Sequence, residues 1–149
     1  MRILAVDPGE KRIGLAISDP TGTIARPLMV LNHTAREEDA QRIVDVAHKE
    51  NVALIIVGQA LDSEGQVGPQ ARKSQRFANA ISGKTACKVE MWDESGTTQA
   101  VVKNQIMMGV SKKKRKGHLD DLAASIMLQD YILTKDANRQ ADEDLNGQA

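Results

Sequence analysis

The apolar run Val52–Val57 constrains the fold more than any other segment of this chain. Its six residues, VALIIV, include no polar side chain, whereas a strand with one solvent-exposed face alternates apolar and polar residues. The run therefore predicts a strand covered on both faces, as in a sheet with helices packed on it. Turn and helix signals before and after the run predict what surrounds this strand.

Shorter patterns predict the neighbouring elements. Three short strand-like runs precede the apolar run, and the turn-forming segments 7–9 and 19–22 separate them, so the three can pair as an antiparallel meander. The segment Thr34–Glu37 matches a capping box, which predicts the start of a helix. Strands are expected at 3–6, 13–17, 23–31, 52–57 and 88–92, and helices at about 35–50, 70–82, 97–108 and 119–133. This order predicts an α/β fold with a mixed five-stranded sheet flanked by helices.

The chain length of 149 residues fits one domain. Residues 136–149 hold four acids, one arginine and, alanine apart, only one apolar side chain, Leu145. Such a segment buries too little apolar surface to order by itself. We therefore expect a folded domain over residues 1–135 and an acidic, disordered tail over residues 136–149.

The net charge of zero conceals an uneven distribution of charge. Removing the tail from the 20 basic and 20 acidic residues leaves 19 bases and 16 acids, a charge of +3 on residues 1–135. Five of these bases are consecutive, in a loop expected between two helices: Lys112, Lys113, Lys114, Arg115 and Lys116. A like-charged run stays extended and suits contact with phosphates, although a loop kept polar for solubility has the same composition. Three aromatic residues are too few for a base-stacking platform.

Composition also bears on the compartment. No apolar run approaches the roughly 20 residues that span a bilayer, and the start MRILAVDPGEKR is unlike a signal peptide. The single cysteine, Cys87, cannot form an intramolecular disulfide, so folding needs no oxidising compartment. We expect a cytoplasmic protein without a membrane partner.

Carboxylates follow two of the expected strands and open the last expected helix, where α/β folds place their chemistry. These are Asp7, the pair Asp93 and Glu94, and the pair Asp120 and Asp121. Each can instead be a turn former, a helix cap or a partner of a helix dipole. Together they fit a site for Mg²⁺ or Mn²⁺, which take oxygen ligands, and two such ions about 4 Å apart can promote hydrolysis of a phosphodiester. No GxSxG or Walker A motif offers a competing catalytic set.

Four motifs then suggest a family. They are DPGEKRIGLAISD at 7–19, IIVGQALDSEGQVGP at 55–69, WDESGTT at 92–98 and HLDDLAASIMLQDY at 118–131. In their order, and over residues 1 to about 133, they closely resemble the YqgF family, also called RuvX. Its members are bacterial proteins of ribonuclease H-like fold, associated with pre-16S rRNA cleavage and Holliday junction resolution.

The resemblance implies a metal-dependent endonuclease in which Asp7, Glu94 and Asp120 are catalytic and hold Mg²⁺ or Mn²⁺. Asp93 would orient its neighbour or cap a helix, and Asp121 is the alternative ligand. Lys11, Arg12 and the basic residues 112–116 would contact the nucleic-acid backbone. The substrate implied is structured RNA, the 5′ region of pre-16S rRNA, with branched DNA as the alternative, bound by a monomer or a homodimer.

Some positions depart from the family pattern. Ser95 stands where the family usually has arginine, so a cation expected beside the acids is missing. No acid follows Gly58, so Glu94 would have to serve from the next strand. The change at position 95 keeps open a non-catalytic RNA-binding module of the same fold. A phosphoryl-transfer enzyme of this fold would need two such lobes, and the chain is long enough for one.

Overall fold

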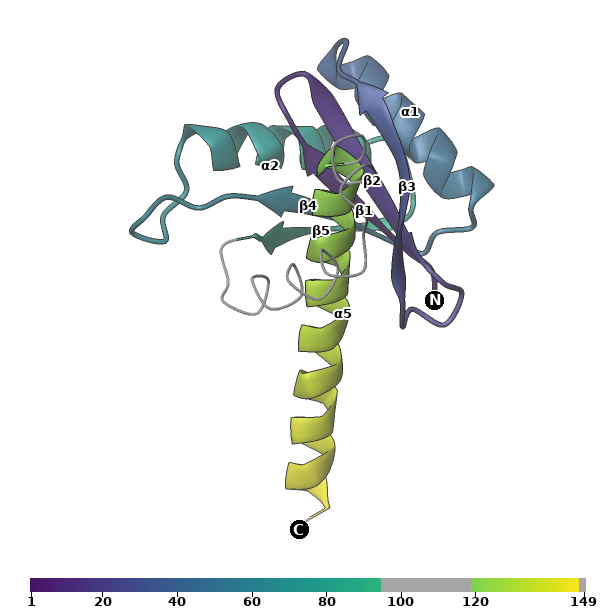
Figure 1. The fold of residues 1–149 in the computed structure, drawn as a ribbon, viewed down its shortest axis with the longest axis vertical. Coiled ribbons are helices and arrows are strands. Elements are labelled where there is room, and N and C mark those ends of the chain that lie inside the picture. The colour runs from purple at the N-terminus through teal and green to yellow at the C-terminus, as the bar shows by residue number, and fades with distance from the viewer. Residues whose placement is uncertain (95–118, 148–149) are drawn as a thin grey trace.

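The computed structural model describes residues 1–94 and 119–147, with side chains from position 122 onward in the second range. Its centre is a five-stranded sheet in the order β3-β2-β1-β4-β5 (Figure 1). Strands β1 to β3 form an antiparallel meander, while β4 pairs parallel with both β1 and β5. The strands are β1 Ile3–Pro8, β2 Arg12–Ser18, β3 Ala25–Asn32, β4 Leu54–Gln59 and β5 Lys88–Asp93.

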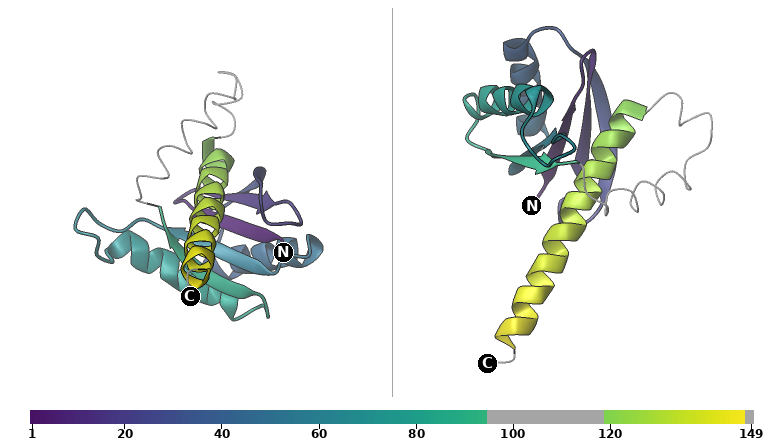
Figure 2. Two further views of the ribbon diagram at one scale, coloured as in Figure 1. Left: turned by 90° about the horizontal axis from the view of Figure 1, so that it is seen from below. Right: turned by 90° about the vertical axis from the view of Figure 1, so that its left-hand side faces the viewer.

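Helices cover both faces of this sheet. Helices α1 (Arg36–Lys49) and α2 (Pro69–Ser82) pack on one face, and α5 (Leu119–Asn146) lies on the other (Figure 2). The interior strand β4 contributes Ile55 and Val57 to the first core and Leu54 and Ile56 to the second. The absence of alternation in this run is thus explained, because both faces of β4 are buried. The predicted mixed sheet with an antiparallel start is confirmed; the helix predicted at 97–108 lies outside the described residues.

The predicted capping box of α1 is wrong. The helix begins at Arg36, and its N-cap residue, Ala35, makes no side-chain cap hydrogen bond. The hydroxyl of Thr34 instead bonds the carboxylates of Glu38 and Asp39. Asp39 is buried, and it also accepts from His33 and from Arg42. This buried acid takes over the hydroxyl that a capping box would use, because its own charge needs partners.

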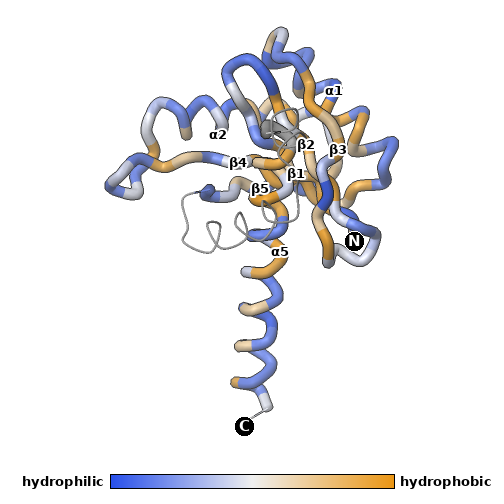
Figure 3. The backbone as a smooth tube through the Cα atoms, in the orientation of Figure 1, coloured by the Kyte–Doolittle hydropathy of each residue, from blue (hydrophilic) through white to orange (hydrophobic). Residues whose placement is uncertain are grey.

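Helix α5 differs from the expected end of the chain. It continues to Asn146 as an exposed helical arm that projects beyond the sheet, where a disordered tail was expected from residue 136 (Figure 1). The arm is mostly hydrophilic (Figure 3). Leu145 on it is 70% exposed. The division into a domain over residues 1–135 and a tail stays a prediction. Within residues 1–94 and 119–147, no helix is both long and apolar enough to cross a membrane.

Candidate active site

The sheet order brings two of the predicted acids together. Strand β4 lies between β1 and β5, and all three run in the same direction. Asp7 directly follows Val6, which pairs with Val57, and Glu94 directly follows the end of β5. The backbone N–H of Glu94 donates to the carbonyl oxygen of Gln59 at 3.0 Å, which holds Glu94 beside the end of β4. The carboxyl groups of Asp7 and Glu94 are hydrogen-bonded to each other.

Gly58 makes room for this pair. A Cβ atom at position 58 would collide with the carboxyl group of Glu94 and with the sulfur of Met127 on α5. Because glycine has no side chain, the Glu94 carboxyl can lie over β4 and reach Asp7 from the neighbouring strand. Sequence reasoning noted that no acid follows Gly58 but missed what this glycine does. The register of β1, β4 and β5 is the information that reveals it.

The electrostatics of the pair are those of two carboxylates that share a proton. Burial, together with the charge and hydrogen bond of Asp7 and the charge of Asp93, raises the pKa of Glu94 from 4.5 to about 8. The Glu94 carboxyl is therefore largely protonated at neutral pH when no cation is bound. A divalent cation at this position would displace that proton, since ionised oxygens are the preferred ligands of a hard cation.

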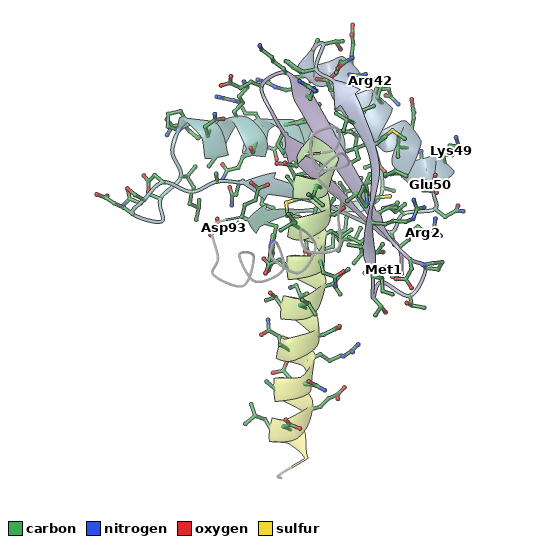
Figure 4. All side chains as sticks on the ribbon, in the orientation of Figure 1. Met1, Arg2, Arg42, Lys49, Glu50 and Asp93 are labelled. Atoms are coloured by element: carbon green, nitrogen blue, oxygen red, sulfur yellow. The ribbon has the colours of Figure 1, made fainter. Side chains whose placement is uncertain are left out.

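The alternation of β5 separates the roles of Asp93 and Glu94. Met91 packs on the side of α1 and α2, whereas Trp92 packs on the side of α5. Asp93, the last residue of β5 (Figure 4), falls on the same face as Met91, and Glu94 falls on the face of α5. The structure thus brings Glu94, and not Asp93, to Asp7; Asp93 acts on the pair through its charge.

The remaining predicted ligands are described only in part. Asp120 and Asp121 lie in the first turn of α5, and their side chains are outside the described set. Asp120 precedes Ala124 by one helical turn, and Ala124 packs in the core between α5 and the sheet.

The residues predicted to contact nucleic acid are likewise described only in part. Lys11 and Arg12 are exposed on the β1–β2 hairpin, only a few residues beyond Asp7. In this hairpin the Gly9 N–H donates to the carbonyl oxygen of Arg12 at 2.9 Å. A Cβ atom at position 9 would collide with that same oxygen. This glycine lets the hairpin close tightly. Residues 112–116 lie outside the described residues.

The donor set fits a divalent cation as far as it is described. Asp7 and Glu94 supply carboxylate oxygens at one point of the sheet edge, which is the chemistry that Mg²⁺ and Mn²⁺ select. Among the side chains that the structure describes, no group of three acids, histidines or cysteines could hold a metal ion. The side chain of Asp120, the predicted third ligand, is not among the described side chains.

A cluster of β5 and α5 side chains supports the end of β5. The indole N–H of Trp92 donates to Oδ2 of Asp130 at 3.0 Å, and Asp130 is only 3% exposed. The Trp92 and Tyr131 rings meet edge to face at 5.1 Å, and the Tyr131 hydroxyl donates to Oε2 of Glu90 at 3.3 Å. Trp92 lies two residues before Glu94, so this cluster fixes the strand that carries the catalytic candidate. Sequence reasoning missed Asp130, which carries no local signal of its partner.

Comparison with known proteins agrees with this architecture. RuvC of Thermus thermophilus, solved with a Holliday junction substrate, matches with a TM-score of 0.57 at 13% identity, over 92% of this chain and 96% of that one. The fowlpox virus resolvase, solved with Holliday junction DNA, matches with a TM-score of 0.55 at 17% identity, over 90% and 98% of the two chains. At these identities the likeness shows the fold alone, and that fold is the RuvC type of the ribonuclease H-like class.

Relatives of higher identity carry a nuclease name. A protein of Chloroflexus aurantiacus is 40% identical over 96% of this chain and 94% of its own length, and one of Halothermothrix orenii is 39% identical over 89% and 94%. Both are named "Putative pre-16S rRNA nuclease". Together with the RuvC-type fold and the paired acids at the sheet edge, these relatives define the chain as an enzyme of the nuclease class. More particularly, it belongs to the family described as RuvX: Holliday junction resolvase, whose model matches residues 1–134.

Proposed function

We propose that this nuclease is a divalent-metal-dependent endonuclease that hydrolyses phosphodiester bonds near the 5′ end of pre-16S rRNA in the cytoplasm. The observation that carries the proposal is the hydrogen-bonded pair Asp7 and Glu94 at the edge of the sheet, with Gly58 beside it. Asp120, at the start of α5, is the third member of the acidic triad in this proposal. The relatives' name supports the choice of RNA.

The roles of the residues follow from their chemistry. Asp7, Glu94 and Asp120 would hold Mg²⁺ or Mn²⁺, and Glu94 would give up its shared proton as the cation binds. When bound, the cations would activate a water molecule and stabilise the leaving oxygen of the phosphodiester. Lys11, Arg12 and the basic residues 112–116 would grip the backbone, with no need for base stacking. The scarcity of aromatic side chains supports a reader of backbone and shape.

Branched DNA is the second candidate substrate. The family description and the junction-bound RuvC structure support it, although a resolvase that cuts two strands symmetrically would act as a dimer. An enzyme that trims rRNA can act as a monomer. The substrate and the oligomeric state are therefore tested together.

The experiment uses an RNA that spans the 5′ end of pre-16S rRNA and a four-way DNA junction, each incubated with the full chain in Mn²⁺. We expect cleavage of the RNA and its loss in Asp7→Asn, which removes one charged ligand of the pair. Product that persists at the wild-type rate in Asp7→Asn would contradict the assignment of the site. Cleavage of the junction alone, by a dimer, would replace the RNA with branched DNA.

A matched pair of glycine variants tests the geometry. Gly58→Ala places a methyl group against the Glu94 carboxyl, so we expect cleavage to fall by at least about tenfold. Gly68→Ala is the control, since apart from its chain neighbours no atom of the described residues lies within 4 Å of a Cβ built at that glycine. Equal activity of the two variants would mean that the position of Glu94 over β4 does not matter for the reaction.

A further inference from the structure

A pocket of about 320 Å³ lies on the other side of the sheet from the acidic pair, between the β1–β2 hairpin and the first turns of α1 and α2. Its volume is at the small end of the range for ligand pockets, roughly 300–1,000 Å³, so it can take one small ligand. Pro8, Gly9 and Glu10 form its hairpin wall, and they directly follow Asp7 in the chain. The pocket and the candidate active site therefore share the same edge of the sheet.

The lining of this pocket combines an apolar wall with cations. Ile13 and Phe77 line it from β2 and α2, and both are buried in the core. Arg36 of α1 and Lys73 of α2 line it from two different helices, and neither has an ion pair within the described part of the chain. Two cations above an apolar wall suit a ligand that carries an anionic group on a flat or apolar body.

The acids of the pocket do not cancel these cations. Asp39 is buried, and it already accepts hydrogen bonds from His33, Thr34 and Arg42. Burial alone would raise the pKa of Asp39. The hydrogen bonds outweigh burial and hold that pKa below its ordinary value. Glu10 is the remaining acid of the lining, and it is exposed at the hairpin. Among the lining side chains that have no ion pair within residues 1–94 and 119–147, two are positively charged and one is negatively charged.

His33 adds a polar ring that is held by Asp39. The ionised Asp39 carboxylate requires a proton on Nδ1 of His33, which leaves Nε2 as the ring nitrogen that Asp39 does not use. The His33 backbone N–H donates to the carbonyl of Lys11 at 2.8 Å, so the main chain of His33 is tied to the hairpin that carries Lys11 and Arg12. The pocket therefore contacts the β1–β2 hairpin, which directly follows Asp7 in the chain.

We propose that this pocket binds a single nucleotide, with its phosphate between Arg36 and Lys73 and its sugar or base against Ile13 and Phe77. The nucleotide is either free or an unpaired nucleotide of a bound strand. If it belongs to a strand, the proposal rests on the proposed function, because that strand is then the substrate whose backbone crosses the β1–β2 hairpin. Nucleotide binding itself depends on neither the metal nor cleavage. It can be measured in metal-free protein.

The test is calorimetric titration of the full chain with adenosine 5′-monophosphate in EDTA, beside adenosine and inorganic phosphate. We expect saturable binding of one nucleotide per chain, weakened about tenfold for adenosine, which lacks the phosphate. Lys73→Ala and Arg36→Ala should each weaken binding about tenfold, and Glu10→Gln should tighten it. The control is Lys49→Ala, the same substitution at an exposed lysine that ends α1, the helix that begins at Arg36 (Figure 4).

The outcomes separate this pocket from the proposed function. No saturable binding of the nucleotide to the wild-type chain, or equal affinities of Lys73→Ala and Lys49→Ala, would overturn the pocket. Displacement of the nucleotide by a short single-stranded oligonucleotide would support the pocket and identify a strand residue as its occupant, whereas binding without displacement would support a free nucleotide. RNA cleavage that is intact while the pocket fails would leave the proposed function standing. Nucleotide binding without any cleavage would support the pocket and contradict the proposed function.

Discussion

The carboxyl of Glu94 is held where its charge is unfavourable, since Asp7 and Asp93 are near and solvent is largely excluded. Between about pH 4.5 and pH 8 the folded chain keeps a proton on Glu94 that the unfolded chain has lost. The metal-free protein should therefore lose stability as pH rises through this range and level off above it. Such a cost is expected of a site that is arranged to receive a cation.

Glu94→Gln tests this cost directly. In EDTA at pH 8.5 we expect the variant to be more stable than the wild type by about 2–4 kcal/mol, since each pKa unit corresponds to about 1.4 kcal/mol, and the two to be nearly equal at pH 5. Urea unfolding at both pH values provides the measurement. Glu90→Gln on the same strand is the control, because a hydrogen bond from Lys88 lowers the pKa of Glu90 and its removal should not stabilise the chain. A variant with no advantage at pH 8.5 would contradict the shared proton.

At the scale of elements, strand β5 and helix α5 are joined by a hydrogen bond that is nearly closed to solvent. The buried Asp130 accepts from Trp92, and its other oxygen, Oδ1, has no hydrogen-bond partner within the described part of the chain. Such a carboxylate depends on the partner that it has, because a buried acceptor that loses its donor bears the cost of desolvation. The Trp92 indole is therefore a structural tie between the strand before Glu94 and the long helix.

We expect Trp92→Phe to lower the free energy of unfolding by about 1–3 kcal/mol. Adding Asp130→Asn should return part of that loss, because an unpaired amide is less costly to bury than an unpaired carboxylate. Urea unfolding of the two single variants and the double variant measures the coupling. Tyr131→Phe is the control in the same cluster; it removes a bond to the more exposed Glu90 and should cost less than about 1 kcal/mol. Strict additivity of Trp92→Phe and Asp130→Asn would mean that the bond contributes nothing.

The elements also separate what sequence can predict from what it cannot. The run at 52–57 predicted a strand with two buried faces because burial on both sides leaves a direct composition signal. The choice of Glu94 over Asp93 as the partner of Asp7 was implied only by the family resemblance, because the sheet order that brings β5 beside β4 is not encoded locally. Gly58 matters because the Glu94 side chain lies over it, and Thr34 forms no capping box because its hydroxyl bonds Asp39. Each of these contacts depends on a side chain from another element or turn. Local propensity therefore predicted the strands well and the contacts between elements poorly.

For the whole molecule, the zero net charge divides into a body of +3 and an arm of −3. The four acids of the arm lie on the exposed end of α5, which extends beyond the body (Figure 1). A negative arm on the same molecule as a basic body weakens the attraction of any polyanion to that body, and salt screens the effect. We therefore expect the arm to weaken substrate binding through its charge alone.

Deletion of residues 136–149 should therefore tighten the binding of RNA. We expect a dissociation constant about two- to fivefold lower at roughly 50 mM salt and no difference near 500 mM, because only the long-range charge has changed. The stability of the body should change by less than about 1 kcal/mol, since residues 137–147 are exposed to solvent and Asp136 is only partly buried. The matched variant keeps the arm and removes three charges, with Asp142→Asn, Glu143→Gln and Asp144→Asn. Fluorescence anisotropy with a labelled RNA in EDTA measures all three proteins. If the deletion tightens binding and the neutralised arm does not, the arm acts by excluding the substrate sterically and the electrostatic account is wrong.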